Sequence, residues 1–190
     1  MKAKPAFRRP AAAILILTLT LLFLPVQSGV AQDVANGLAT ATVLAGLAVT
    51  AVQDLAFGNV LQGVAKSTPN NNDATSGIFS IAGAASAGIS IYLTLPDYMA
   101  LADGSDRMTI AFSSTDASVD TTVATPSTVV AGDGWVDVNP RGLGALAGGP
   151  VIGTVGQTNL YLGGRVTPTV DQKAGAYTGD IICTVAYNGT

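Results

Sequence analysis

Gly88-Ile89-Ser90-Ile91-Tyr92-Leu93-Thr94-Leu95-Pro96 is the stretch of sequence that decides the fold. Its apolar residues occupy every second position, which is the period of a β-strand with one buried face. We therefore predict that the odd-numbered residues from Ile89 to Leu95 face the core, while the even-numbered residues from Ser90 to Thr94 face solvent. Pro96 ends the strand because proline cannot donate a hydrogen bond to a ladder.

The same alternation recurs at several other places in the chain. It predicts that Met108, Ile110 and Phe112 share a core face. It also predicts a core face for Leu160, Leu162 and Val166, with Tyr161, Arg165 and Thr167 on the opposite, solvent face. In residues 177–188 it places Ile181, Cys183, Val185 and Tyr187 on one face, and Thr178, Asp180, Thr184 and Asn188 on the other. Further candidate strands are residues 39–43, 47–52, 78–82, 128–130 and 135–138.

Turn-forming residues separate these candidate strands. Gly, Asn, Asp and Pro gather in residues 69–73, 102–106, 132–134, 139–142 and 147–150. Such residues tolerate positive φ or cannot continue a ladder. Eight or nine short strands with this punctuation predict an all-β, immunoglobulin-like antiparallel β-sandwich. We expect no helix in it beyond a possible turn near residues 96–101.

The first residues predict export. Lys2, Lys4, Arg8 and Arg9 precede an apolar run of residues 11–24, which Pro25 closes and small residues follow. This is the layout of a secretory signal peptide, and the run is shorter than a membrane-spanning helix needs. We predict a cleavable signal peptide in residues 1–31 and a single β-sandwich domain in residues 32–190. The protein is then secreted, on the cell surface or in the periplasm.

The charge of the expected mature chain limits its partners. All 12 acidic residues are aspartates that follow residue 32, against five basic residues, so the net charge is −7. So few cations cannot neutralise many phosphates, which argues against nucleic acid and anionic membranes. Histidine and glutamate are absent, which removes the commonest general base and one of the two carboxylate side chains. We expect protein or glycan partners and no enzymatic activity.

The strongest candidate for a chemical site is calcium binding by two oxygen-rich loops, residues 70–73 and 103–106. Neither has the spacing of a known calcium loop, so we interpret them as surface turns. We therefore predict no catalytic, metal or cofactor-binding residue and no cofactor. Trp135 could stack on a sugar, but its sequence context favours a ring packed on the core. Cys183, the single cysteine, is expected to be a small buried hydrophobe.

A tyrosine corner is a further expected folding feature. Asp171, Gly175 and Tyr177 have the spacing seen in immunoglobulin-like sandwiches, where a tyrosine hydroxyl returns to the backbone just upstream.

Several short stretches also resemble a known family. They are Gln53-Asp54-Leu55-Ala56-Phe57-Gly58, residues 159–164, residues 174–179 and residues 185–188. In this order they resemble the small secreted bacterial proteins grouped as domain of unknown function number forty-four oh two. Such proteins are similar to spore-coat-U-like and archaic chaperone–usher pilin domains, which a strand from a neighbour completes. The resemblance implies a fimbrial or surface-coat role and no catalytic residues. The lone Cys183 departs from the many usher pilins that carry a disulfide.

Two functions follow as expectations. The first is a non-enzymatic structural subunit of a surface filament, fimbria or coat, which associates with itself or with other surface proteins through β-strand exchange or edge pairing. The alternative is a monomeric adhesin or glycan-binding module. The apolar segment of residues 38–52 could be a donated strand or the domain's own first strand or pair of strands, and the sequence leaves both open.

Overall fold

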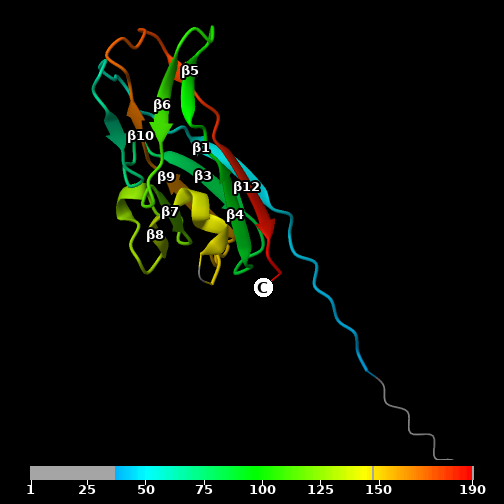
Figure 1. Cartoon of the computed structure of the whole chain (residues 1–190). Coiled ribbons are helices and arrows are strands. Elements are labelled where there is room, and N and C mark those ends of the chain that lie inside the picture. Colours follow the sequence, from blue (N-terminus) through cyan, green and yellow to red (C-terminus); the bar gives the residue numbers. More distant parts are fainter. Residues whose placement is uncertain (1–36, 147, 190) are drawn as a thin grey trace, which may run out of the picture. The chain divides into compact units, whose positions relative to one another are not determined.

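Twelve β-strands and two 3₁₀ helices make up the regular structure of the part that the computed structural model describes, residues 37–146 and 148–189. Residues from Thr42 onward form one compact unit. Every strand pairing in this unit is antiparallel, in two five-stranded sheets and one two-stranded ladder (Figure 1). The structure therefore confirms the predicted all-β, immunoglobulin-like antiparallel sandwich class.

The sheets are built from strands that are distant in sequence. The first sheet contains β1 (Ala48–Gln53), β3 (Gly77–Ala82), β7 (Ala117–Asp120), β8 (Gly134–Val138) and β9 (Gln157–Leu162), in the order β1-β3-β9-β7-β8. The second contains β2 (Lys66–Thr68), β5 (Tyr98–Leu101), β6 (Arg107–Ala111), β10 (Gly164–Thr167) and β11 (Tyr177–Thr178), in the order β11-β5-β6-β10-β2. The two-stranded ladder pairs β4 (Ile89–Thr94) with β12 (Ile182–Tyr187).

Short connections join these three parts. β4 leads directly into β5, and β11 leads into β12, so the two-stranded ladder follows on from the second sheet. β9 leads into β10 through Gly163, where the chain crosses from the first sheet to the second. A Cβ at Gly163 would lie 2.6 Å from both the Thr68 carbonyl oxygen and the Asn70 nitrogen. The crossing therefore requires glycine because the backbones approach so closely.

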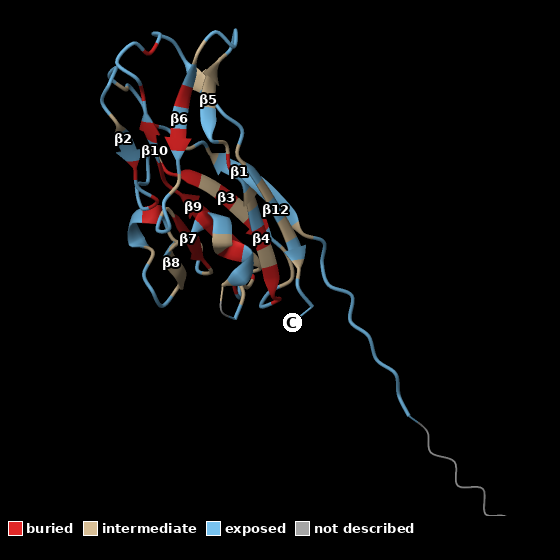
Figure 2. Ribbon diagram, viewed as in Figure 1, coloured by how far each residue is buried: buried red, intermediate tan, exposed pale blue. Residues whose placement is uncertain are grey.

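The main core lies between the first sheet and β4, as the buried segments in Figure 2 show. Ile89 and Ile91 are fully buried there, as the alternation in this strand predicted, and Leu93 packs against the same core. The partner strand β12 contributes its predicted inward residues Cys183, Val185 and Tyr187, while Thr184 is exposed. The remaining buried members come from the first sheet, from a 3₁₀ helix that contains Leu143, and from two loops: Phe79, Ile81, Leu95, Ala117, Val119, Leu143, Ile152, Leu160 and Leu162.

A second, smaller core lies under the second sheet. Its buried members are Phe57, Met108, Ile110 and Val166. Leu55 and Met99 pack against them and stay partly exposed. This end of the sandwich thus buries much less apolar surface than the other.

The prediction that Tyr161 faces solvent is wrong. β9 is the central strand of the first sheet, and Tyr161 is 1% exposed. Its hydroxyl donates to the Ala124 carbonyl oxygen and accepts a hydrogen bond from Asn159 Nδ2. Asp120 holds the same loop by accepting hydrogen bonds from the Thr122 and Ala124 backbone nitrogens. This loop covers the second face of β9, so both faces of this strand are buried although its residues alternate in polarity.

Other expectations need correction as well. Residues 98–101 form strand β5, not a helical turn, because they pair with β6 in a hairpin. Residues 126–128 form the 3₁₀ helix η1 (Pro126–Thr128), so the strand expected at 128–130 is absent. Asn70 is not part of a surface turn: it is 5% exposed, and its Nδ2 donates to the Thr115 carbonyl and Ser118 Oγ. Residues 39–43 form no strand and are exposed.

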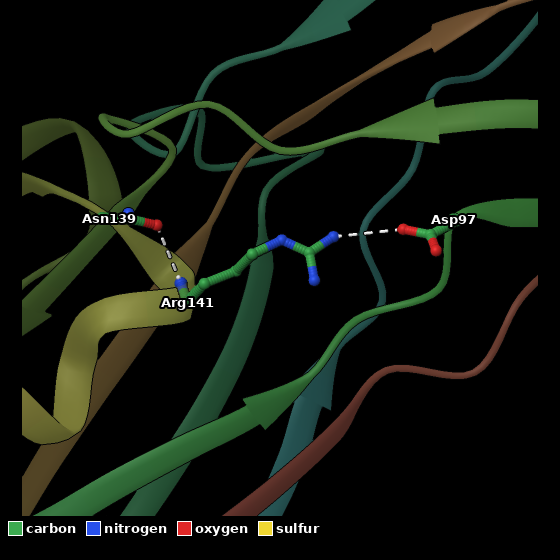
Figure 3. Close-up of polar contacts among 3 residues, drawn as sticks. All are labelled: Asp97, Asn139 and Arg141. Carbon is green, nitrogen blue, oxygen red and sulfur yellow. Dashed lines mark hydrogen bonds and ion pairs between the residues drawn. The ribbon is translucent and has the colours of Figure 1, made fainter.

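The other 3₁₀ helix, η2 (Pro140–Ala145), packs beside β4. Asn139 Oδ1 accepts a hydrogen bond from the Arg141 backbone nitrogen at 2.9 Å, so it caps the first turn (Figure 3). The Arg141 guanidinium reaches Asp97, between β4 and β5, with an N–O distance of 3.2 Å. Both side chains are largely exposed, so this ion pair contributes about 1 kcal/mol at most.

Candidate functional site

Two segments of the sandwich run antiparallel to each other, with β1 in contact with β12, and hydrogen bonds join them near both ends. At one end, which we call the entry end, Tyr187 Oη donates to the Ala45 carbonyl and accepts from the Ala84 nitrogen, both at 2.7 Å. At the other, which we call the far end, the Gly63 nitrogen donates to the Thr169 carbonyl at 2.9 Å. Residues 45–63 thus form one side of a gap, and residues 169–187 form the other.

The strand edges along this gap are unpaired in the described part of the chain. β1 pairs with β3 alone, β12 with β4 alone and β11 with β5 alone. Each of these three strands therefore has one edge whose backbone N–H and C=O groups make no ladder. Such an edge is a template for another strand.

Two neighbouring hollows lie in the gap, with volumes of about 650 and 850 Å³. The first lies between the end of β1 and residues 178–182, and its lining includes Phe79. The second continues toward the far end beside residues 55–60. Leu55, Met99 and Tyr177 line both hollows, so the two adjoin, and we call them together the edge groove.

The floor of the edge groove is apolar. Phe57, Met108 and Val166 of the second core line it, together with the half-exposed Leu55 and Met99. Phe57, Met108 and Val166 are already buried, so an inserted apolar segment would cover mainly the partly exposed Leu55 and Met99. Burying apolar surface stabilises by about 25 cal/mol per Å², so the groove offers a binding energy that the isolated chain does not use.

A polar cluster closes the groove beside Tyr177. The Tyr177 hydroxyl lies 2.6 Å from Asp106 Oδ2 and 2.8 Å from the Lys173 carbonyl oxygen, and it accepts a hydrogen bond from Gln172 Nε2 at 2.8 Å. The return of the hydroxyl to the backbone four residues upstream confirms the predicted tyrosine corner. Asp106 Oδ2 also accepts from the Lys173 nitrogen at 2.8 Å.

These contacts shift the acidity of the cluster. The hydrogen bond from the Tyr177 hydroxyl, followed by that from the Lys173 backbone, lowers the pKa of Asp106 to about 2. Desolvation, and then the Asp106 hydrogen bond, raise the pKa of Tyr177. The carboxylate form of Asp106 and the phenol form of Tyr177 are therefore the ones that hold this wall of the groove.

This cluster predicts an acid-sensitive contribution to stability. Because the folded state lowers the pKa of Asp106 below its ordinary value of 3.8, its contribution is complete above that value and is lost as the pH falls toward 2. We expect Asp106→Asn to lower the melting temperature at pH 6 and to reduce the loss between pH 5 and pH 2. Asp171→Asn, at an exposed position in the adjacent loop, is the matched control. Identical pH profiles for the three proteins would contradict the assignment.

The other candidate site residues of the sequence analysis do not line the edge groove. Asp103 Oδ1 accepts a hydrogen bond from the Ser105 nitrogen within its own turn, and both Asp73 oxygens accept from Ser127, so Asp73 joins two loops. Trp135 packs partly buried against the main core. Cys183 is half-buried, and desolvation raises the pKa of its thiol to about 11, which disfavours the reactive thiolate.

Sequence reasoning did not identify the residues of the groove. Leu55 and Phe57 belong to a stretch whose only signal is its resemblance to a family, and the sequence predicts a turn, not a groove wall, around Met99. Their common property is that they line a gap between segments more than 100 residues apart in sequence. No local pattern reports such a gap.

Residues 37–46, which precede β1, form no strand and are all exposed. Leu38 is 90% exposed and Val43 is 94% exposed. Leu47 is the first residue of this stretch to pack against the main core. The domain's own first strand is therefore β1, and the apolar residues before it lack any cover in the described structure.

Comparison of the sequence with models of known protein families and with curated proteins gives no match. Across residues 37–146 and 148–189, no helix has the length and apolar character needed to cross a membrane.

Proposed function

We propose that this chain is an exported structural subunit of a surface filament, fimbria or coat, and that its copies associate by β-strand exchange. In this proposal, residues before β1 of one copy occupy the edge groove of another. The partner is a second copy of the same chain. No catalysis and no cofactor enter the proposal.

The observation that carries the proposal is the edge groove itself. It combines an apolar floor with unpaired strand edges on both sides, from β1 and from β11 and β12. A strand placed between two such edges gains backbone hydrogen bonds on each side, and its alternate side chains meet the floor. A pocket that binds a small molecule does not need unpaired strand edges beside it, so these edges favour a strand as the occupant.

The chemistry of the segment before β1 fits this groove. Ala39, Ala41 and Val43 fall on one face of an extended strand, and Thr40 and Thr42 fall on the other. The small apolar face suits a shallow groove, and threonine has a high strand propensity on a wet face. Residues 37–43 contain no charged side chain that would have to be desolvated.

The setting outside the cytoplasm also belongs to the proposal. It rests on the signal-like residues 1–31, which lie outside the described residues, and on the resemblance to secreted pilin-like domains. A secreted subunit without an internal disulfide must gain its stability from packing or from assembly. Cover by a neighbour for Leu55 and Met99, which flank the second core and stay partly exposed, would add to this stability.

The alternative, a monomeric adhesin or glycan-binding module, would use exposed aromatic rings. Among the described residues, only two aromatic side chains are more than half exposed, those of Tyr92 on β4 and Tyr98 on β5, which is few for a glycan-binding surface. We therefore rank this function second and treat it as an outcome of the tests.

Ala51→Lys provides a test that leaves unchanged the segment before β1, residues 32–43, which we call the arm. Ala51 is exposed on β1 and lines the edge groove, so a lysine there should fold normally but place a long charged side chain where the inserted strand would lie. We expect filaments in the unaltered mature protein and at least a tenfold loss of assembly in the variant, measured by size-exclusion chromatography and negative-stain microscopy.

Thr50→Lys is the control for this experiment, because Thr50 is the neighbouring exposed residue of β1 and does not line the groove. We expect it to assemble like the unaltered protein. Equal assembly of both variants would show that the groove is not the site of association. A mature protein that stays monomeric at high concentration would favour the binding-module alternative.

A further inference from the structure

The two methionines of the described chain are neighbours in the edge groove. Met99 of β5 and Met108 of β6 lie directly opposite each other in the β5–β6 hairpin. Both line the hollow of about 850 Å³, and Met99 lines the other hollow as well. The remaining methionine of the sequence is Met1. Among the described residues, thioether side chains therefore occur only at this groove.

The two methionines differ in exposure. Met108 is 7% exposed and belongs to the buried second core, whereas Met99 packs against that core and stays partly exposed. Gly179 also lines the groove, and a Cβ at this position would lie 3.4 Å from Met99 Cγ. Because glycine has no side chain, this neighbour leaves Met99 open to the groove. Small dissolved molecules therefore reach Met99 more readily than Met108.

The main core is built without methionine. Its buried members are Ile, Leu, Val, Phe and Ala residues. The one other sulfur atom of the described residues, that of Cys183, packs against this core and does not line the groove. Oxidation of the exposed thioether would therefore alter the groove and leave the main core intact.

We propose that Met99 is a site of oxidation to methionine sulfoxide, and that this modification prevents the edge groove from binding an apolar strand. The oxidant is a peroxide, such as hydrogen peroxide. The thioether sulfur attacks one peroxide oxygen, an S–O bond forms as the O–O bond breaks, and water leaves. The sulfur loses two electrons and the peroxide gains them. This inference rests on the proposed function, because it regulates the same groove.

Oxidation makes the groove surface polar at its most accessible apolar side chain. Reduced methionine is a flexible apolar side chain that adapts to the residues covering it, whereas the sulfoxide carries a polar oxygen. An apolar side chain placed over that oxygen would remove its water and offer no hydrogen-bond donor. The open groove of a free subunit exposes Met99 to the oxidant, and an arm in the groove would protect it.

Treatment of the unassembled mature protein with hydrogen peroxide tests the modification site. All proteins carry Cys183→Ala, which removes the only thiol. Trypsin cleaves after Arg107, between the two methionines, so mass spectrometry follows each of them on a separate peptide. We expect Met99 to gain one oxygen atom at least tenfold faster than Met108. Equal rates, or faster oxidation of Met108, would overturn the assignment whatever the function of the groove.

Assembly of the oxidised subunit tests the effect on the groove. We expect at least a tenfold loss of filaments, measured by light scattering and negative-stain microscopy. Met99→Leu keeps an apolar side chain of similar volume without sulfur, so this variant should assemble normally before and after the same treatment. Met108→Leu is the matched control and should remain sensitive to peroxide. Normal assembly of the oxidised parent, or equal loss in the treated Met99→Leu protein, would overturn the inference.

Oxidation of assembled material separates this inference from the proposed function. Because an arm in the groove would cover Met99, we expect its oxidation to be at least tenfold slower in filaments than in the free subunit. Equal rates would mean that no strand occupies the groove, and would overturn the proposed function together with this inference. Absence of filaments from the untreated protein would do the same. Protection of Met99 in filaments, combined with normal assembly of the oxidised subunit, would overturn this inference alone.

Discussion

Replacement of Ile91 by aspartate is expected to unfold most of the protein at 25 °C. Ile91 is completely buried in the main core and lies opposite Val185 in the β4–β12 ladder. The substitution removes a large apolar side chain and leaves a carboxyl group among apolar neighbours. Loss of the side chain alone costs about 2–5 kcal/mol, and an unpaired buried polar group adds about 1–3 kcal/mol. The sum is comparable with the whole stability of a typical domain, about 5–15 kcal/mol.

Thr94→Asp is the control on the same strand, because Thr94 is exposed and lies opposite the exposed Ile182. We expect a change of about 0.5 kcal/mol or less at this position. Urea unfolding followed by far-ultraviolet circular dichroism measures both effects. Similar destabilisation by the two substitutions would mean that the faces of β4 are wrongly assigned.

The contrast between β4 and β9 shows where sequence alternation suffices. In β4 one face meets the core and the other stays wet, so the period of two in residues 89–94 predicts both faces correctly. In β9 the alternating Leu160 and Tyr161 are both buried, because a loop held by Asp120 covers the second face of the central strand. Alternation in the sequence reports only the polarity of side chains. Because the polar hydroxyl of Tyr161 is hydrogen-bonded inside the protein, this residue is buried although the pattern places it on the solvent face.

Short and context-dependent elements were beyond prediction for a related reason. β2 and β7 have three and four residues, which is too short to show a period. Tyr98–Leu101 is a strand because it pairs with β6, although its sequence has no clear strand pattern. Tertiary pairing overrides local propensity in such segments. The edge groove depends on the same long-range pairings, so the sequence could suggest an apolar arm but not its acceptor.

Deletion of residues 32–43 is expected to abolish assembly while the sandwich stays folded. Of these residues, 37–43 are described, are exposed and belong to no strand, so their loss removes no core contact. The truncated protein keeps Ala45, whose carbonyl oxygen accepts a hydrogen bond from Tyr187, and Leu47, which packs on the main core. We expect the truncated protein to be a soluble monomer whose free energy of unfolding differs by about 0.5 kcal/mol or less from that of unassembled full-length protein.

The deleted peptide added in trans should then bind the empty groove. At a concentration 100 times its dissociation constant, a ligand specific for the folded state stabilises it by about 2.7 kcal/mol. For a domain of this size, this corresponds to a rise in melting temperature of roughly 5–10 °C, which differential scanning fluorimetry detects easily. The peptide must present one face to the groove floor, and alternation assigns Ala39 and Ala41 to that face with Val43.

Two modified peptides test this orientation. A peptide with Ala39→Asp and Ala41→Asp should not bind, because it would bury two carboxylates against Leu55, Met99 and their neighbours. A peptide with Thr40→Asp and Thr42→Asp carries the same charge on the outward face and should retain most of the thermal shift. If neither the parent peptide nor the outward-substituted one stabilises the truncated protein, or if truncation itself unfolds the sandwich, the arm is not a donated strand. A full-length protein that is also monomeric would then favour the binding-module function, since neither strand exchange nor edge pairing would be linking its copies.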